Sequence, residues 1–289
     1  MDAQLKQRDA RGLASAWLEA GPEAATDATP ILLMMHGFPD AAQSWSFQID
    51  ALKDRYTIVA PFVRGTGPSE KSDQVRRYSP DAVALDVLEI LKDVDPGGKR
   101  PIITVGHDLG CVHAWHLAEL LQSRAKGVVL INGLTVSQMA RRLTKPAQLK
   151  KSWYIFLMQV PILPELLART ASVPLLRFAH ARGGLPAGLR PAIESAKSVM
   201  LGPLNQYRAF MRDIPRALRR SSKRLACPVL ALWGASDAFV VAPRRDELER
   251  EAEDVTVRIL PGNHWLHRQD HERVNRLLEE FIARNGVKV

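Results

Sequence analysis

The chain has 289 residues, of which 46% are hydrophobic and 25% are charged. This composition is ordinary for a globular protein and excludes a fibrous or largely disordered chain. No apolar run reaches the length of a membrane span, and the charged opening stretch contains no signal-peptide core. Cys111 and Cys227 form no metal or disulfide pattern. We therefore expect buried thiols in a reducing compartment and a cytoplasmic protein.

The net charge of +9 is concentrated in one internal segment. Residues 134–222 contain 15 Lys and Arg against 3 Asp and Glu, so the rest of the chain is slightly acidic. Such a segment favours an acidic substrate or an anionic membrane surface, or it is simply the solvated face of surface helices. No nucleic-acid-binding motif accompanies the charge, so nucleic acid is not an expected partner.

Short apolar runs alternate with helix-like stretches along the chain. Strands are predicted at 14–19, 31–35, 56–60, 101–105, 127–131, 229–233 and 255–260. Helices are predicted from Pro80, capped by Ser79, to about residue 95, directly after strand 101–105, from about Pro243, and from about His271. This alternation predicts an α/β fold with a mostly parallel sheet and helices on both faces.

Residues 134–222 differ from this pattern, because they are rich in Arg, Leu and Pro and contain no alternating strand. We interpret them as a helical cap domain inserted into a core domain made of residues 1–133 and 223–289. A loop is predicted inside the cap at Ala181–Pro186.

The stretch Gly106-His107-Asp108-Leu109-Gly110 lies between strand 101–105 and the helix-like run CVHAWHLAELL. Strand, sharp turn and helix are the setting of the nucleophile elbow G-x-S-x-G, with Asp in the Ser position. A carboxylate suits displacement at a saturated carbon and leaves an alkyl ester that water can cleave. The alternative is an ordinary strand–helix join in which the Asp caps the helix.

Three further features follow strands in the order that an elbow nucleophile needs. His36-Gly37-Phe38-Pro39 follows strand 31–35, so the backbone N–H groups of Phe38 and Leu109 are candidates for an oxyanion hole. Asp237 follows strand 229–233 and His264 follows strand 255–260. Their order predicts that His264 is a general base for water, oriented by Asp237. His267 and His271 are interpreted as packing or surface residues without a metal.

These motifs together resemble the epoxide hydrolase-like branch of the α/β-hydrolase superfamily, over residues 12 to 285. The resemblance is carried by HGFP at 36–39 with Trp45 nearby, RGTGPS at 64–69, GHDLG at 106–110, WGASD at 233–237 and GNHW at 262–265. It implies an α/β-hydrolase fold, no cofactor, and an enzyme that opens an epoxide to a vicinal diol through an ester on Asp108. It also implies substrate contacts from His36, Pro39, Trp45 and Trp265.

The resemblance extends to two tyrosines of the cap. Members of this branch use two cap tyrosines to hydrogen-bond and protonate the epoxide oxygen. The segments SWYIFLMQ at 152–159 and LNQYRA at 204–209 resemble the family's two motifs and imply that Tyr154 and Tyr207 have these roles. The alternative for each is a core aromatic whose hydroxyl has a local partner.

Two positions depart from the family pattern. Leu109 stands where relatives often have Trp, which in haloalkane dehalogenases helps to hold the halide, and Phe62 stands where relatives commonly have Asp. The first departure counts against a haloalkane or haloacid dehalogenase with the same triad, which remains the alternative enzyme. A catalytically idle hydrolase-fold binding protein is the non-enzyme alternative.

The apolar stretch Trp153–Ala168 beside the basic charge suggests a lipophilic small-molecule epoxide. A peripheral membrane contact through the basic cap and a homodimer stay open at this point.

Overall fold

The structure is a computed structural model that describes residues 2–185, 200–219 and 224–286. Within these residues eight strands form one sheet in the order β1-β2-β4-β3-β5-β6-β7-β8. The strands are β1 (Gln4–Ala10), β2 (Leu13–Ala20), β3 (Ile31–Met35), β4 (Thr57–Phe62), β5 (Ile102–His107), β6 (Ala125–Ile131), β7 (Val229–Gly234) and β8 (Val255–Leu260). Strands β3 to β8 are parallel, which confirms the predicted sheet, and β2 pairs antiparallel with both β1 and β4.

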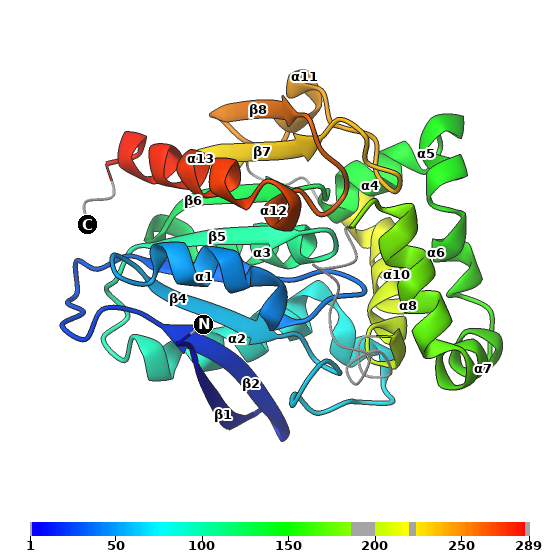
Figure 1. Cartoon of the computed structure of the whole chain (residues 1–289), viewed down its shortest axis with the longest axis horizontal. Helices are drawn as coiled ribbons and strands as arrows, with labels where there is room; N and C mark the ends of the chain where they lie inside the picture. Colours follow the sequence, from blue (N-terminus) through cyan, green and yellow to red (C-terminus); the bar gives the residue numbers. More distant parts are fainter. Residues whose placement is uncertain (1, 186–199, 220–223, 287–289) are drawn as a thin grey trace.

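Helices cover both faces of the sheet because its central strands are apolar on both sides (Figure 1). In β3, Ile31 and Leu33 pack in one core cluster with α2 (Pro80–Val94) and α3 (Gly110–Leu121). Leu32 and Met34 point to the opposite face, in a cluster with α1 (Ser46–Leu52) and α13 (His271–Arg284). The helical layers thus hold in place the strands whose carboxyl ends are followed by the candidate catalytic residues.

Most predicted core elements agree with the structure to within a few residues. Ser79 caps α2 by accepting a hydrogen bond from the Ala82 N–H at 3.2 Å, and Pro80 is the first residue of the helix. The helix predicted from Pro243 is only one turn, α11 (Arg245–Leu248), and a further turn, α12 (Leu266–Gln269), precedes α13.

Strand β1 was not predicted, because its sequence QLKQRDA has no apolar alternation. The strand lies at the edge of the sheet and pairs only with β2 among the described strands, so most of its side chains face solvent. Period-2 patterning arises from burying one face, and an edge strand without a buried face does not show it.

The described residues between β6 and β7 are helical, and we call residues 134–185 and 200–219 the helical segment. Its helices are α4 (Val136–Arg142), α5 (Pro146–Lys151), α6 (Trp153–Leu157), α7 (Leu163–Thr170), α8 (Ser172–Arg182) and α10 (Leu204–Arg219). They lie beyond the carboxyl ends of the parallel strands (Figure 1). None of the described helices has the length and apolarity needed to cross a bilayer.

The loop predicted at Ala181–Pro186 begins later than expected. Ala181 and Arg182 complete the last turn of α8, and the chain turns at Gly183 and Gly184. Pro186, like residues 187–199 and 220–222 of the predicted cap, lies outside the described residues.

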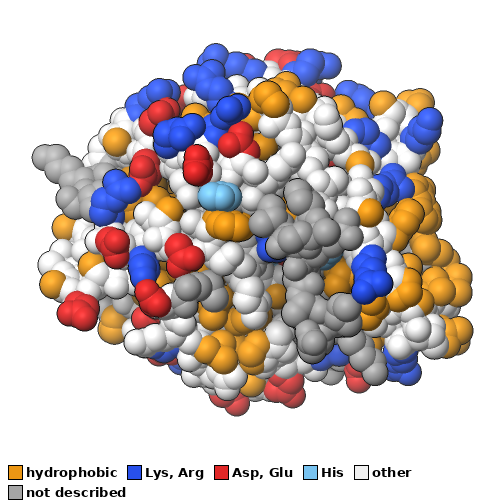
Figure 2. All heavy atoms as spheres, in the orientation of Figure 1, with side chains coloured by type: hydrophobic (Ala, Val, Ile, Leu, Met, Phe, Trp, Pro, Cys, Tyr) orange, Lys and Arg blue, Asp and Glu red, His pale blue; other side chains and the backbone are white. Residues whose placement is uncertain are grey.

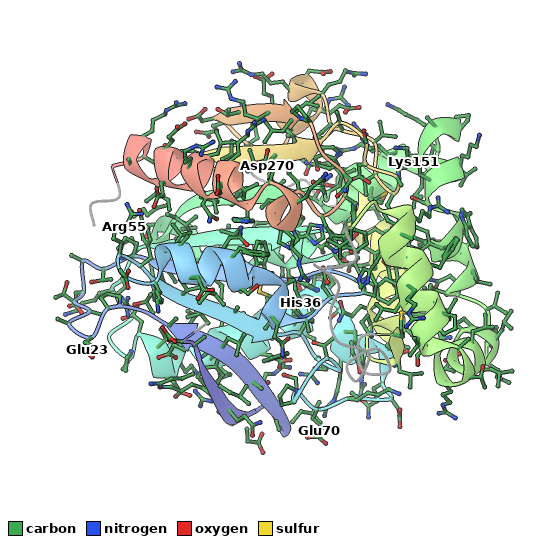
Figure 3. All side chains as sticks on the ribbon, in the orientation of Figure 1. Glu23, His36, Arg55, Glu70, Lys151 and Asp270 are labelled. Atoms are coloured by element: carbon green, nitrogen blue, oxygen red, sulfur yellow. The ribbon has the colours of Figure 1, made fainter. Side chains whose placement is uncertain are left out.

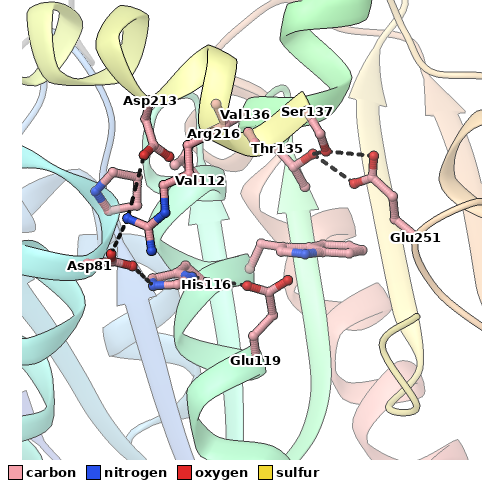
Figure 4. Close-up of a pocket in the computed structure, with 13 residues that line it drawn as sticks. Asp81, Val112, His116, Glu119, Thr135, Val136, Ser137, Asp213, Arg216 and Glu251 are labelled. Carbon is pink, nitrogen blue, oxygen red and sulfur yellow. Dashed lines mark hydrogen bonds and ion pairs between the residues drawn. The ribbon is translucent and has the colours of Figure 1, made fainter. Parts of the chain in front are cut away.

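Glu251, in the loop before β8, joins the helical segment to the core. Its carboxylate accepts hydrogen bonds from Thr135 at 2.9 Å and Ser137 at 2.7 Å (Figure 4). It also accepts from Gln138 at 3.2 Å and Arg141 at 2.7 Å. These donors come from the N-cap and the helix of α4, and Glu251 itself is 4% exposed. Because one buried carboxylate accepts from all of these donors, its removal leaves every one of them without this hydrogen-bond acceptor.

We expect Glu251→Ala to lower the free energy of unfolding by about 3 kcal/mol, because buried donors of α4 lose their acceptor. Urea unfolding followed by circular dichroism measures the change. The neighbouring exposed Glu253 provides the matched control, since Glu253→Ala should change stability by less than about 0.5 kcal/mol. Equal losses in the two variants would contradict this role of Glu251.

Candidate active site

Asp108 is at the tip of a tight turn between β5 and α3. Its backbone φ of 53° is a conformation that costs energy for a residue other than glycine. A Cβ atom on Gly110 would lie 2.0 Å from the Met35 carbonyl oxygen, and one on Gly106 would lie 2.5 Å from the Gly110 carbonyl oxygen. The two glycines therefore let strand and helix approach closely enough to hold Asp108 in this conformation.

The two carboxylate oxygens of Asp108 face different groups. Oδ1 accepts a hydrogen bond from the Phe38 N–H at 3.0 Å. Oδ2 lies 3.5 Å from Nε2 of His264. The predicted oxyanion donor Phe38 is thus at the carboxylate, and Leu109 directly follows Asp108 at the start of α3. The N–H of Leu109 stays a predicted second donor.

His264 is held on its other side by Asp237, as the sequence predicts. Nδ1 of His264 donates to Oδ2 of Asp237 at 3.0 Å. Oδ1 of Asp237 accepts from the backbone N–H groups of Phe239 at 2.7 Å and Val240 at 3.0 Å. These contacts fix the carboxylate, which in turn fixes the tautomer and the orientation of the imidazole.

Burial and charge act against each other on this triad. Burial alone lowers the pKa of His264, but the Asp237 carboxylate and then Asp108 outweigh it and raise the pKa above the usual value. Burial raises the pKa of Asp108, yet the hydrogen bond and charge of His264 prevail and lower it. The pKa of Asp237 is lowered in the same way, against burial, by His264. The shifts of all three groups favour their charged forms, which are a protonated imidazole between two carboxylates.

A layer of buried polar side chains supports the histidine from behind. Nε2 of His107 donates to the His264 carbonyl oxygen at 2.8 Å, and Nε1 of Trp265 donates to Asp40 at 2.7 Å. Asp40, His107 and His267 are fully buried, and their potential ligand atoms lie within 4.8 Å of one another. His267 is thus a packing residue, as predicted. The fold also brings the Asp40 carboxylate close to it, and the spacing of the two residues in the sequence could not reveal this.

Tyr154 of α6 and Tyr207 of α10 lie together above Asp108. Their ring centroids are 5.9 Å apart at an interplanar angle of 86°, and Tyr207 also meets Phe38 edge-on at 5.3 Å. Burial, followed by the charge of Asp108, raises the pKa of Tyr154, and burial likewise raises the pKa of Tyr207. Both hydroxyl groups therefore keep their protons at neutral pH and can act as donors.

The triad and the tyrosines open into one mostly apolar cavity of about 110 Å³. Among the described residues, five side chains supply its polar groups: Asp108, His264, Tyr154, Tyr207 and Arg182. The remaining lining consists of Phe38, Pro39, Trp153, Leu157, Met158, Leu175, Phe178, Ala179, Met200 and Phe239. A few convergent polar groups in an apolar cavity are typical of a site for a small apolar molecule.

Three of the residues predicted to contact substrate are buried and are not among the described residues that line the cavity. His36, marked in Figure 3, accepts from the Val63 N–H at 3.1 Å and connects two loops of the core. Trp45 is fully buried and packs on His267 at 4.7 Å. Trp265 is fully buried and supports the His264 ring edge-on at 5.0 Å. Pro39, the fourth residue predicted to contact substrate, does line the cavity.

Sequence reasoning missed two residues that contact the triad. Nδ2 of Asn132 donates to Oδ2 of Asp237 at 2.6 Å, and Lys151 at the end of α5 donates to the Asp237 carbonyl oxygen (Figure 3 marks Lys151). Asn132 directly follows β6, and a polar residue at the end of a buried strand was the signal that could have found it. No local signal distinguishes Lys151 from the other lysines of the segment.

A second cleft, lined by α2, α3, α4 and α10, contains charged groups that are already paired with one another (Figure 4). Arg216 of α10 binds Asp81 at 2.5 Å, and Asp81 also lies 2.6 Å from His116. Like Glu251, these groups connect the helical segment to the core. We therefore place the candidate active site in the cavity at Asp108.

The family model described as the alpha/beta hydrolase fold matches residues 30–270. Epoxide hydrolase 3 of Xenopus tropicalis is 28% identical over 268 residues, which cover 88% of this chain and 71% of that protein. Epoxide hydrolase A of Mycobacterium tuberculosis is 28% identical over 95% of this chain and 96% of its own length. An epoxide hydrolase of Bacillus megaterium, solved as a point mutant with its diol product, superimposes with a TM-score of 0.81 at 21% identity, over 96% of this chain and all of that chain.

The chain therefore belongs to the α/β-hydrolase fold family. Within that family it resembles the epoxide hydrolases, as its sequence motifs predict.

We expect Asp108→Asn to lower the pKa of His264, because one of the two carboxylates that hold its proton is lost. A pH titration of the ring ¹⁵N shifts by NMR measures this, with the exposed-site variant Asp93→Asn as control. Since the folded pKa lies above the unfolded value, the ionised triad stabilises the fold at neutral pH and loses that contribution as pH rises through the folded pKa. An unchanged His264 titration in Asp108→Asn would contradict the charge assignment.

Proposed function

We propose that the protein is an epoxide hydrolase that converts a lipophilic epoxide to a vicinal diol through an ester on Asp108. The observation that carries the proposal is that the carboxylate of Asp108 lines one apolar cavity together with Tyr154 and Tyr207. Its Oδ1 is bound by the Phe38 N–H, whereas Oδ2, among the contacts of the described residues, faces only the imidazole of His264 at 3.5 Å. The similarity to named epoxide hydrolases supports the same reaction class.

In the first step, Oδ2 of Asp108 attacks an epoxide carbon and the ring C–O bond breaks. Tyr154 and Tyr207 hydrogen-bond the ring oxygen, and one of them transfers its proton to the developing alkoxide. The raised pKa of both tyrosines keeps these protons available before the reaction. Assigning the attack to Oδ2 follows from the contacts, because Oδ1 is already engaged by the Phe38 N–H.

In the second step, His264 removes a proton from water, which attacks Cγ of Asp108. The oxyanion forms on Oδ1, where the N–H of Phe38 and the predicted N–H of Leu109 hold it. The bond from Cγ to the substrate oxygen then breaks, and the diol leaves with a proton returned by His264. The hydroxyl group from water stays on Cγ of Asp108 and gives its proton to His264, which restores the carboxylate and the imidazolium. The tyrosine recovers its proton from solvent. The chemistry is complete without a metal or an organic cofactor.

The charges of the site link the two steps. Forming the ester removes the negative charge of Asp108, one of the two charges that raise the pKa of His264. The imidazole then loses its proton to solvent more readily and becomes the base that the second step needs. The helical segment acts as the cap domain in this scheme, because it supplies both tyrosines and closes the cavity over Asp108.

We expect Asp108→Ala to lower epoxide turnover by roughly 10⁴-fold or more, because the nucleophile is lost. His264→Gln should instead allow ester formation and block its hydrolysis, so a covalent adduct should accumulate. Intact-protein mass spectrometry after incubation with a panel of epoxides detects the added mass, and His271→Gln on α13 serves as control. Failure of His264→Gln to retain any epoxide would count decisively against the ester mechanism.

We expect Tyr154→Phe and Tyr207→Phe together to reduce epoxide opening by about 10²-fold or more, because the leaving oxygen loses its acid. A dehalogenase using the same triad does not need a proton for its leaving halide. Diol formation and halide release, assayed side by side on epoxides and haloalkanes, therefore separate the two reactions. Halide release that persists in the double variant while the parent forms no diol would favour the dehalogenase. Absence of turnover on both panels would favour a binding protein.

A further inference from the structure

The cavity at Asp108 opens onto an exposed apolar surface of the helical segment. Trp153 and Phe178 line the cavity, yet they are 47% and 58% exposed. Further exposed apolar side chains come from the same helices and the turn between them. We call the whole set the apolar face: Trp153, Phe156, Val160, Ile162, Leu163, Leu166 and Phe178.

Figure 2 shows apolar side chains gathered on the flank where Figure 1 places α6, α7 and α8. Monomeric soluble proteins rarely expose a large contiguous patch of this kind, and such patches mark surfaces that bind a partner or a membrane. The position of the apolar face, at the mouth of the cavity, ties it to the entry of the substrate.

Ile162 is the most exposed member of the apolar face. Its side chain is 77% exposed, and its backbone has a φ of 68°. This conformation is costly for a β-branched residue, and such cost is found where a residue has a function in that position. The turn before α7 thus presents an apolar side chain to the outside at an energetic cost.

The charge around the apolar face is positive. Lys150, Arg169 and Arg177 are exposed on α5, α7 and α8. Between residues 145 and 185 the chain contains one acidic residue, Glu165, and Arg208 of α10 pairs with it at 2.5 Å. Apolar side chains within a basic surround match a bilayer with anionic headgroups, since the rings and aliphatic chains enter the interface while the cations meet the lipid phosphates.

We propose that the apolar face docks on an anionic lipid bilayer and that the cavity receives its substrate, an epoxide carried on a long acyl chain, directly from the bilayer. Docking is independent of the reaction. Delivery of the substrate rests on the proposed epoxide hydrolase function.

The first test is sedimentation of the full chain with vesicles of phosphatidylcholine and phosphatidylglycerol, compared with vesicles of phosphatidylcholine alone. We expect binding to the anionic vesicles that weakens as salt is raised. Ile162→Asp with Leu166→Asp should reduce it on the order of tenfold, because charged side chains replace apolar ones at the interface. Neither residue lines the cavity. Arg169→Glu with Arg177→Glu should reduce it by at least about fivefold for each arginine.

Matched controls lie on the core, away from the apolar face. Ile259→Asp on β8 changes an apolar residue that is 57% exposed, and Arg276→Glu reverses an exposed charge on α13. Both controls should bind vesicles like the parent, and thermal unfolding checks that all variants are folded. Equal binding by the parent and the face variants, or no binding by the parent, would overturn the proposal. So would a dimer by light scattering that Ile162→Asp dissociates, because the apolar face would then be covered by a second copy.

The second test compares an epoxidised long-chain fatty ester embedded in the anionic vesicles with a short, water-soluble alkyl epoxide. The face variants should lose activity on the embedded epoxide by about the factor of their binding loss and keep it on the soluble one. Equal loss on both substrates would overturn delivery from the bilayer. Vesicle binding without hydrolysis of either epoxide would reject the proposed function and substrate delivery but retain docking.

Discussion

The buried charge of Asp108, His264 and Asp237 is the constraint on which the rest of the site depends. Three ionised groups in an apolar cavity are stable only if each faces an opposite charge or a hydrogen-bond donor. The protein meets this condition with His264 between the two carboxylates and with backbone N–H groups at the far oxygens of both. The pKa shifts that poise the site for reaction are a consequence of the same arrangement.

The parallel sheet makes this arrangement possible. Loops after β3, β5, β7 and β8 leave the same edge of the sheet, so residues far apart in the chain meet there. The buried layer beneath, with His107 bound to the His264 carbonyl oxygen, keeps the histidine loop in place. The residues of this layer, such as His107 and Trp265, are not among the described residues that line the cavity. They support the histidine loop from behind.

The helical segment has two distinct surfaces. Its inner surface supplies Tyr154 and Tyr207 to the cavity, and it is attached to the core through Glu251, Asp81 and the Asp237 carbonyl oxygen. Its outer surface is apolar and basic. Because Trp153 and Phe178 belong to both surfaces, the route to Asp108 and the surface offered to a partner are the same part of the molecule.

The sequence by itself determined the sheet, the elbow and the order of the triad. These features have local signals in the sequence, namely apolar runs of strand length and the two glycines that flank Asp108. The glycines allow a sharp turn with close strand–helix contact at this point. The sequence could not predict strand β1, whose side chains lack a buried face, or that the helix expected from Pro243 is the single turn α11. Of the two predicted oxyanion donors, Phe38 donates its N–H to Asp108 in the structure, and the role of both stays a prediction.

Only the tertiary structure decided which motif residues reach the cavity. His36, Trp45 and Trp265 belong to the same motifs as Phe38, Pro39 and His264, yet they point into the core. The contacts of Asn132, Glu251 and Lys151 could not be predicted because their partners lie roughly a hundred residues away in the chain. A motif fixes the path of the backbone, but burial of each side chain depends on segments that come from elsewhere in the chain, and only folding brings them together.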